Sequence, residues 1–214
     1  MKVYIGLEVL LFVGMVICKL FFQAFVFMKC LNLLPILFTA GYVTLYRRRV
    51  GTSLKSLHLV LLLAVIGDLL FVVDEAIYGV YLFFLIQLCL LYYLNRTQLK
   101  PWYLIILAIL IFVLCYVFNK NYLVVQGMLY IVLFLYNLWC LFKRSRYAKR
   151  ELSLFLAFLF LSICDVQVFL IYQFQKQGAA VLYENICFII EWFCYIRFQV
   201  FLTKYIMNCG AIKE

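Results

Sequence analysis

Proline, glycine and histidine are scarce in this sequence. The 214 residues include two prolines, nine glycines and one histidine. Linkers between domains are usually rich in proline, glycine or polar residues, so we expect one domain over residues 1–214. A zinc site needs several histidine or cysteine ligands, and the single histidine and the lack of a C-x-x-C pair argue against one. The nine cysteines lie mostly in apolar runs, where cysteine packs as a small hydrophobic residue.

The motifs of several enzyme families are missing as well. No Walker A loop, G-x-S-x-G, H-E-x-x-H or EF-hand pattern occurs. Val65 and Ile66 precede Gly67 and Asp68, which excludes the G-x-G-D of intramembrane aspartyl proteases. The spaced aspartates of CDP-alcohol phosphotransferases are absent too. We therefore expect no cofactor.

Hydrophobic side chains dominate the sequence instead. They make up 69% of the chain, against roughly 45–50% in an average soluble domain, and a soluble core of this size could not bury them. A spanning helix needs about 20 apolar residues. Division of the sequence at its charged and turn-forming clusters predicts an all-α polytopic membrane bundle with about eight transmembrane helices. The predicted helices cover residues 3–22, 30–46, 57–73, 76–94, 101–118, 121–142, 152–174 and 180–206.

The positions of lysine and arginine explain the net charge of +10. Cytoplasmic loops of membrane proteins carry an excess of basic residues. Most of them fall on the side of both termini, whereas Lys19, Lys29, Lys120 and Lys176 fall on the other. Both termini are therefore predicted to be cytoplasmic, and no nucleic-acid partner is needed. We expect an integral, multi-pass protein of a bacterial inner (plasma) membrane that keeps its first helix, because no cleavage site follows it.

Two acidic residues lie inside the predicted apolar helices. Asp68 belongs to segment 57–73 and Asp165 to segment 152–174, and neither has another charged residue within five positions in the sequence. An ionised carboxylate in a bilayer core costs about 2.5 kcal/mol or more, so such residues usually face a bundle interior or a polar cavity. The two helices run in the same direction, which places both carboxyl groups in the outer half of the bilayer.

Four more polar residues are predicted to bind a substrate beside these aspartates. Gln87 and Glu191 lie in helices that run inward, and Lys29 and Asn32 begin the second helix. Together with the aspartates they would line one pocket between helices, which is a common kind of ligand site. Gln87 and Asn32 have an alternative role as hydrogen-bonding groups between helices, and Lys29 as an interfacial cation. For Glu191, a role in the substrate site and a purely structural role both stay open.

The order and spacing of several residues follow a known pattern. Its features are a lysine and a proline in the second helix, Gly-Asp in the third, a glycine with phenylalanine four residues later in the fourth, and Ser-x-x-Asp in the seventh. They are Lys29, Pro35, Gly67, Asp68, Gly79, Phe83, Ser162 and Asp165. With the eight-helix layout, this pattern resembles the YhhN family of lysoplasmalogenase-like membrane proteins. Gln87 stands where that family has a histidine.

The resemblance implies an enzyme that hydrolyses the vinyl-ether bond of a lysoplasmalogen to a fatty aldehyde and a glycerophospho-base. Asp68 and Asp165 would be its catalytic acid and base and would share one proton, and Lys29 would hold the lipid phosphate. The expected partner is a lysophospholipid or another membrane lipid, and the oligomeric state stays open. The alternative is a non-enzymatic proton-coupled transporter or lipid-binding sensor that uses the buried aspartates as a proton or ligand site.

Overall fold

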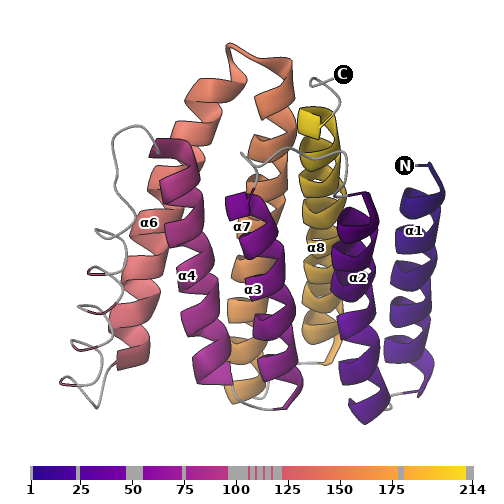
Figure 1. The fold of residues 1–214 in the computed structure, drawn as a ribbon. Coiled ribbons are helices and arrows are strands. Elements are labelled where there is room, and N and C mark those ends of the chain that lie inside the picture. The colour runs from indigo at the N-terminus through magenta and orange to yellow at the C-terminus, as the bar shows by residue number, and fades with distance from the viewer. Residues whose placement is uncertain are drawn as a thin grey trace. The chain divides into compact units, whose positions relative to one another are not determined.

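A computed structural model describes residues 2–22, 25–46, 55–73, 76–95, 122–177 and 181–210, and the single residues 106, 109, 113 and 117. Within these residues it contains seven α-helices and no β-strand, which confirms the all-α class (Figure 1). The helices are α1 (Lys2–Ile17), α2 (Phe25–Tyr46), α3 (Lys55–Val72), α4 (Ala76–Asn95), α6 (Tyr122–Ser145), α7 (Lys149–Gln177) and α8 (Val181–Gly210). A π-helical turn, η1 (Cys18–Phe22), continues α1.

The helix boundaries follow the predicted segments closely. Each predicted segment except 101–118 corresponds to one helix, with ends that agree within a few residues. The start of α2 differs most, because the helix begins at Phe25 and not at residue 30. The apolar residues at 25–28 contain no glycine or proline that would end a helix, so Lys29 lies inside α2 and not at its start. Segment 101–118 lies outside the described residues apart from four helical positions.

Among the described residues, three helices are long and apolar enough to cross a membrane. They cover Lys2–Phe21, Lys149–Val168 and Val181–Cys209. Large apolar side chains of α1 are also exposed on the protein surface, for example Val3 and Leu10. Contiguous exposed apolar surface is rare in soluble monomers, whereas hydrocarbon solvates it without cost. The chain is therefore a membrane protein with transmembrane helices.

The chain forms two compact units. Unit 1 consists of Met1–Val50 and Ser145–Glu214, and so contains α1, α2, α7 and α8. Unit 2 consists of Gly51–Arg144 and contains α3, α4 and α6. All three of the long apolar helices belong to unit 1. The single domain over residues 1–214 stays a prediction.

In unit 1, α1 and α8 lie side by side and run antiparallel. The Thr203 hydroxyl donates to the Tyr4 hydroxyl at 3.4 Å near the start of α1 and the end of α8. Toward the opposite ends of the two helices, Lys19 Nζ lies 5.3 Å from the centroid of the Phe188 ring. The first and last helices of the chain therefore begin and end at the same end of unit 1 (Figure 1).

The long helices α7 and α8 form the main antiparallel pair of unit 1. Tyr205, near the end of α8, donates a hydrogen bond to Glu151 in the first turn of α7. Farther along the pair, the rings of Phe158 and Phe198 meet edge to face with centroids 5.9 Å apart. The start of α7 therefore lies at the same end of the unit as the start of α1 and the end of α8.

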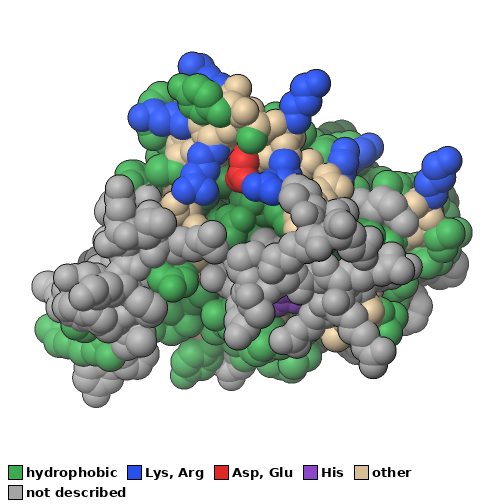
Figure 2. All heavy atoms as spheres, turned by 45° about the horizontal axis from the view of Figure 1, so that its top comes forward, with side chains coloured by type: hydrophobic (Ala, Val, Ile, Leu, Met, Phe, Trp, Pro, Cys, Tyr) green, Lys and Arg blue, Asp and Glu red, His purple; other side chains and the backbone are tan. Residues whose placement is uncertain are grey.

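Basic side chains gather at this end of unit 1. Lys149 and Arg150 begin α7, Arg146 precedes it, and Lys204 lies in the last two turns of α8, all of them exposed. Figure 2 turns this end toward the reader and shows the Lys and Arg side chains on it. Lys19 lies near the opposite end, at the junction of α1 and α2. Within unit 1, the distribution of basic residues is thus the one expected of a membrane protein.

Unit 2 is built on a hairpin of α3 and α4, with α6 beside α4. Gly67 of α3 packs against the Phe83 ring of α4. The α4–α6 pair runs parallel, because two hydrogen bonds between their described residues both join positions 50 apart in the sequence. One joins Gln87 to Asn137, and the other joins the Leu94 carbonyl oxygen to the Arg144 guanidinium. Arg144 thereby supplies a donor to one of the last carbonyl groups of α4, which have no partner within the helix.

Candidate functional site

Asp68 and Asp165, the predicted catalytic pair, are both half-buried within apolar helices. Asp68 lies in α3 and directly follows Gly67, the residue that contacts the Phe83 ring. Asp165 lies in α7, three residues after Ser162, whose hydroxyl donates to the Leu159 carbonyl oxygen at 2.7 Å. Asp68 belongs to unit 2 and Asp165 to unit 1, so their pairing in one pocket stays a prediction.

Gln87, a predicted substrate-binding residue, is fully buried in unit 2 and bonded to another helix. Asn137 Nδ2 of α6 donates to the Gln87 carbonyl oxygen at 2.9 Å and to Gln87 Oε1 at 3.1 Å. Within the described part of the chain, Gln87 Nε2 and Asn137 Oδ1 have no hydrogen-bond partner. The contact supports the alternative considered for Gln87, a hydrogen bond that joins two membrane helices.

The remaining predicted site residues lie on two helices of unit 1. Glu191 is half-buried in α8. Lys29 and Asn32 belong to α2, and their side chains lie outside the described residues. No group of three or more His, Cys, Asp or Glu side chains that could hold a metal ion occurs among the residues that the structure describes.

A cluster of five buried polar residues in unit 1 was not predicted from the sequence. It consists of Tyr4 and Glu8 of α1, Thr39 of α2, and Gln199 and Thr203 of α8, which we call the Glu8 cluster. Each of these side chains is at most 1% exposed. Tyr4 and Glu8 are four residues apart, as are Gln199 and Thr203, so each pair lies on one face of its helix. The cluster therefore joins three helices at positions that all lie toward the basic end of unit 1.

Thr39 is the centre of the Glu8 cluster. Its Oγ1 lies 2.7 Å from the Tyr4 hydroxyl oxygen, 2.8 Å from Gln199 Oε1 and 3.2 Å from Glu8 Oε1. Thr203 extends the chain of contacts from α8 by donating to the Tyr4 hydroxyl at 3.4 Å. One hydroxyl group of α2 thus contacts both α1 and α8, which hold the acid and the amide.

Aromatic contacts hold the Tyr4 ring in position. It stacks on Tyr42 with centroids 4.7 Å apart and an interplanar angle of 22°, and on Phe38 at 5.6 Å and 11°. Phe38 and Tyr42 are four residues apart on α2 and flank Thr39 in the sequence. Such stacked pairs contribute about 0.5–1.5 kcal/mol each beyond their buried area. The packing of the ring therefore keeps the Tyr4 hydroxyl against Thr39.

Two polar atoms of the cluster have no hydrogen-bond partner among the described residues. They are Glu8 Oε2 and Gln199 Nε2, and both are buried. A buried donor or acceptor without a partner costs about 1–3 kcal/mol, and an ionised carboxylate costs more. These two atoms therefore lower the stability of the fold, and a role other than stabilisation is needed to explain why they are buried.

The sequence did contain a signal for this cluster. Glu8 is the only acidic residue of α1, and it lies in an apolar segment, as Asp68 and Asp165 do. Polar residues four apart within an apolar helix, such as Gln199 and Thr203, are a second signal. Neither signal shows which helices meet, because Thr39 lies 31 residues from Glu8 and 160 from Gln199.

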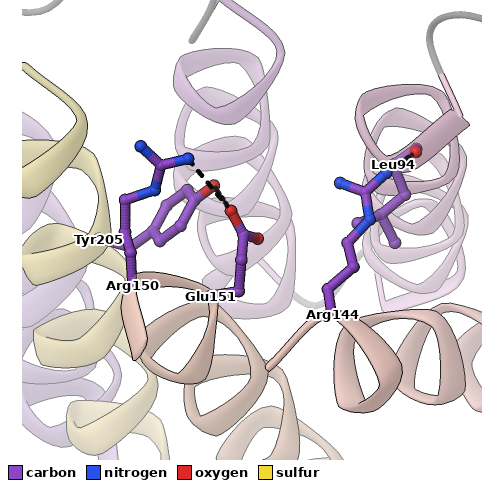
Figure 3. A network of polar contacts seen from close by, with 5 residues as sticks. All are labelled: Leu94, Arg144, Arg150, Glu151 and Tyr205. Atoms are coloured by element: carbon purple, nitrogen blue, oxygen red, sulfur yellow. Dashed lines mark hydrogen bonds and ion pairs between the residues drawn. The ribbon is translucent and has the colours of Figure 1, made fainter. Parts of the chain in front are cut away.

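A second polar group of unit 1 lies at its basic end (Figure 3). Glu151 is 8% exposed, and its Oε1 accepts a hydrogen bond from the Tyr205 hydroxyl at 3.0 Å. Arg150 Nη2 lies 3.5 Å from the same oxygen, and Arg150 is itself exposed. The Glu151 backbone N–H donates to the Ala148 carbonyl oxygen at 2.9 Å, in the turn before α7. A carboxylate in a first helical turn is also stabilised by the helix dipole. Stabilisation of the fold is therefore enough to explain this polar group.

None of the protein-family models, curated proteins and solved structures compared with this chain matches it. The resemblance to the YhhN family therefore rests on the residues that carry it in the sequence. The Glu8 cluster is supported by the burial of its side chains and by the distances between them.

Proposed function

We propose that the protein is a multi-pass protein of a bacterial inner membrane with eight transmembrane helices and cytoplasmic termini. The three long apolar helices support insertion into a membrane. The start of α1, the start of α7 and the end of α8 share one end of unit 1, and basic residues gather there, which supports a cytoplasmic location for that end.

We further propose that it is a lipid hydrolase of the YhhN type, which cleaves the vinyl-ether bond of a lysoplasmalogen. The observation that carries this proposal is the packing beside Asp68. Gly67 lets the α4 ring of Phe83 approach the α3 backbone, so the carboxyl group that follows is attached to a tightly packed hairpin. Catalytic groups need such a fixed position to act on a bound substrate.

The chemistry needs one neutral and one ionised carboxyl group. The acid transfers its proton to the vinyl carbon remote from the oxygen, which leaves an oxocarbenium ion. Water adds to that ion while the carboxylate accepts a proton from the water. The resulting hemiacetal separates into a fatty aldehyde and the free hydroxyl group of the glycerophospho-base. Asp68 and Asp165 are proposed to share these two roles, with Lys29 at the lipid phosphate and Gln87, Asn32 and Glu191 lining the pocket.

The test is aldehyde release from a lysoplasmalogen by the purified full-length protein in detergent. Asp68→Asn and Asp165→Asn should each abolish it, and the matched control Glu184→Gln, in the first turn of α8, should retain it. Size-exclusion chromatography shows whether each variant remains folded. Full activity in either aspartate variant would rule out the shared-proton mechanism.

The Glu8 cluster favours the second candidate, a non-enzymatic membrane protein that moves protons or senses a lipid. Buried acids within transmembrane helices are typical parts of proton relays. Glu8 is a fully buried acid bonded to Thr39 of α2, which in turn bonds to Gln199 of α8. Reconstitution in liposomes separates the candidates. Uptake that requires a proton gradient supports a transporter, and aldehyde formation without any gradient supports the hydrolase.

A further inference from the structure

We propose that the Glu8 cluster is a proton-binding site, in which Glu8 is neutral in the structure seen here and loss of its proton is coupled to rotation of the Gln199 side-chain amide. This inference goes beyond the proposed function and does not depend on it. It requires neither a lipid substrate nor a role for Asp68 or Asp165.

The first argument is the number of hydrogens in the cluster. Thr39 has one hydroxyl hydrogen, but both Gln199 Oε1, at 2.8 Å, and Glu8 Oε1, at 3.2 Å, lie within its reach. The Tyr4 hydroxyl accepts from Thr203 at 3.4 Å and lies 2.7 Å from Thr39 Oγ1, to which it can donate its own hydrogen. With an ionised Glu8, the Thr39 hydrogen could serve only one of the two acceptors. The other oxygen would then face Thr39 with no hydrogen between them.

One added proton removes this conflict. A neutral Glu8 donates from its carboxyl group to Thr39 Oγ1, and Thr39 donates its own hydrogen to Gln199 Oε1. Thr39 then accepts two hydrogen bonds, from Glu8 and Tyr4, which matches its two lone pairs. Each of the four contacts named above then contains one hydrogen, so this orientation of Gln199 fits the protonated form.

The contacts of Thr39 can also each contain a hydrogen after Glu8 has lost its proton. If the Gln199 amide rotates by half a turn, Nε2 takes the place of Oε1 and donates to Thr39. The Thr39 hydrogen is then free to bond to the ionised Glu8. The proton itself is exchanged with water, and no other group of the cluster gains or loses one. The charge of Glu8 and the orientation of Gln199 therefore change together.

The surroundings of Glu8 favour the neutral form. Within the described parts of unit 1, no Lys or Arg side chain forms an ion pair with Glu8. Among the described side chains of α2, the titratable group beside the cluster is Tyr42, which stacks on Tyr4. From α8, Arg197 and Lys204 are exposed. A buried carboxylate with no cation beside it is very costly in an apolar medium.

The distances also distinguish a proton from a metal ion. A bound cation separates its oxygen ligands, because each ligand contacts the ion at about 2.3–2.6 Å for Ca²⁺. In the cluster, the oxygens of Tyr4 and Gln199 instead contact the Thr39 oxygen directly, at 2.7 and 2.8 Å. These are ordinary lengths for a hydrogen bond between oxygens. A proton fits the arrangement and an ion between the oxygens does not.

Infrared spectroscopy of the full-length protein in liposomes tests the proposal. Carbon-13 labelling of the glutamate carboxyl groups separates their bands from those of aspartate. At neutral pH we expect a band of a neutral glutamate that Glu8→Gln abolishes and that the control Glu184→Gln keeps. As the pH is raised, this band should disappear together with a change in a glutamine amide band, and Gln199→Leu should remove the amide change. Identical neutral-glutamate bands in the wild type and Glu8→Gln would overturn the proposal.

A second pair of variants keeps the test valid if Glu8→Gln does not fold. Thr39→Val removes the hydroxyl group at nearly constant volume and should shift the neutral-glutamate band to higher frequency, whereas Thr39→Ser should leave it in place. An unshifted band in Thr39→Val contradicts the proposal. So does a band that varies with sodium or potassium concentration at constant pH, because that result would indicate a cation site.

Discussion

Gly67 of α3 lies so close to Phe83 of α4 that a β-carbon at position 67 would be 3.1 Å from Cε2 of the ring and 3.4 Å from Cδ2. Most real β-carbon contacts are longer than the first of these distances. The hairpin of unit 2 thus depends on the missing side chain of one residue, and that residue precedes Asp68.

Gly67→Ala should be less stabilising than the same change elsewhere in a helix. Alanine favours a helix over glycine by about 1 kcal/mol, but at position 67 the new methyl group pushes the Phe83 ring. At Gly41 of α2, the control, a β-carbon meets nothing within 4 Å. We expect Gly41→Ala to raise the free energy of unfolding and Gly67→Ala to lower it or leave it unchanged, as measured by denaturant titration in detergent. Addition of Phe83→Leu should relieve the loss, and equal effects at the two glycines would contradict the contact.

Asn137→Leu should destabilise unit 2. The change removes both hydrogen bonds to Gln87 and leaves its buried Oε1 without that donor, at a cost of about 1–3 kcal/mol. The double variant with Gln87→Leu should recover much of the loss, because neither of these two amides then stays buried without its partner. The measurement is a double-mutant cycle of unfolding free energies. Additive effects of the two changes would show that the amides do not interact.

Tyr205→Phe should weaken the contact between α7 and α8 at the basic end of unit 1. It removes the donor to the buried Glu151 carboxylate and keeps the ring, so we expect a loss of about 1–3 kcal/mol in unfolding free energy. Tyr147→Phe is the matched control, because Tyr147 is 91% exposed. A stability loss of the same size in the control would refute a specific role for the Tyr205 hydroxyl.

The proposed orientation predicts which residues a membrane-impermeant thiol reagent reaches. In a variant without the nine native cysteines, Tyr147→Cys should react in inverted membrane vesicles and not in intact spheroplasts. Lys19→Cys, near the other end of unit 1, should show the opposite pattern. Reaction of both from the same side would mean that the predicted helix count or orientation is wrong.

The sequence predicted the helices well because their cause is local. Runs of about 20 apolar residues separated by charged or turn residues determine where a chain can be helical in a membrane. The predicted segments 57–73 and 76–94 accordingly became α3 and α4 with almost the same ends. The predicted start of α2, at residue 30, is wrong because a single lysine does not end a helix, and α2 begins at Phe25 with Lys29 inside it.

The polar residues could be assigned to a site only in part. Asp68, Asp165 and Glu191 were recognised as acids in apolar helices, and the structure finds each of them half-buried. Glu8 meets the same criterion in α1, but its position in the sequence does not show which helices pack against it. The hydrogen bond of Gln87 to Asn137 had no local signal, since it joins residues 50 apart.

The sequence by itself determined that this protein is helical, that it enters a membrane, and which acids are costly to bury there. Those properties follow from composition and from the length of apolar runs, both of which act along the chain. The tertiary structure decided which polar groups meet. Thr39 could bond to Glu8 and Gln199 only once α1, α2 and α8 had packed side by side, because hydrogen bonds act over about 3 Å and these residues are far apart in the sequence.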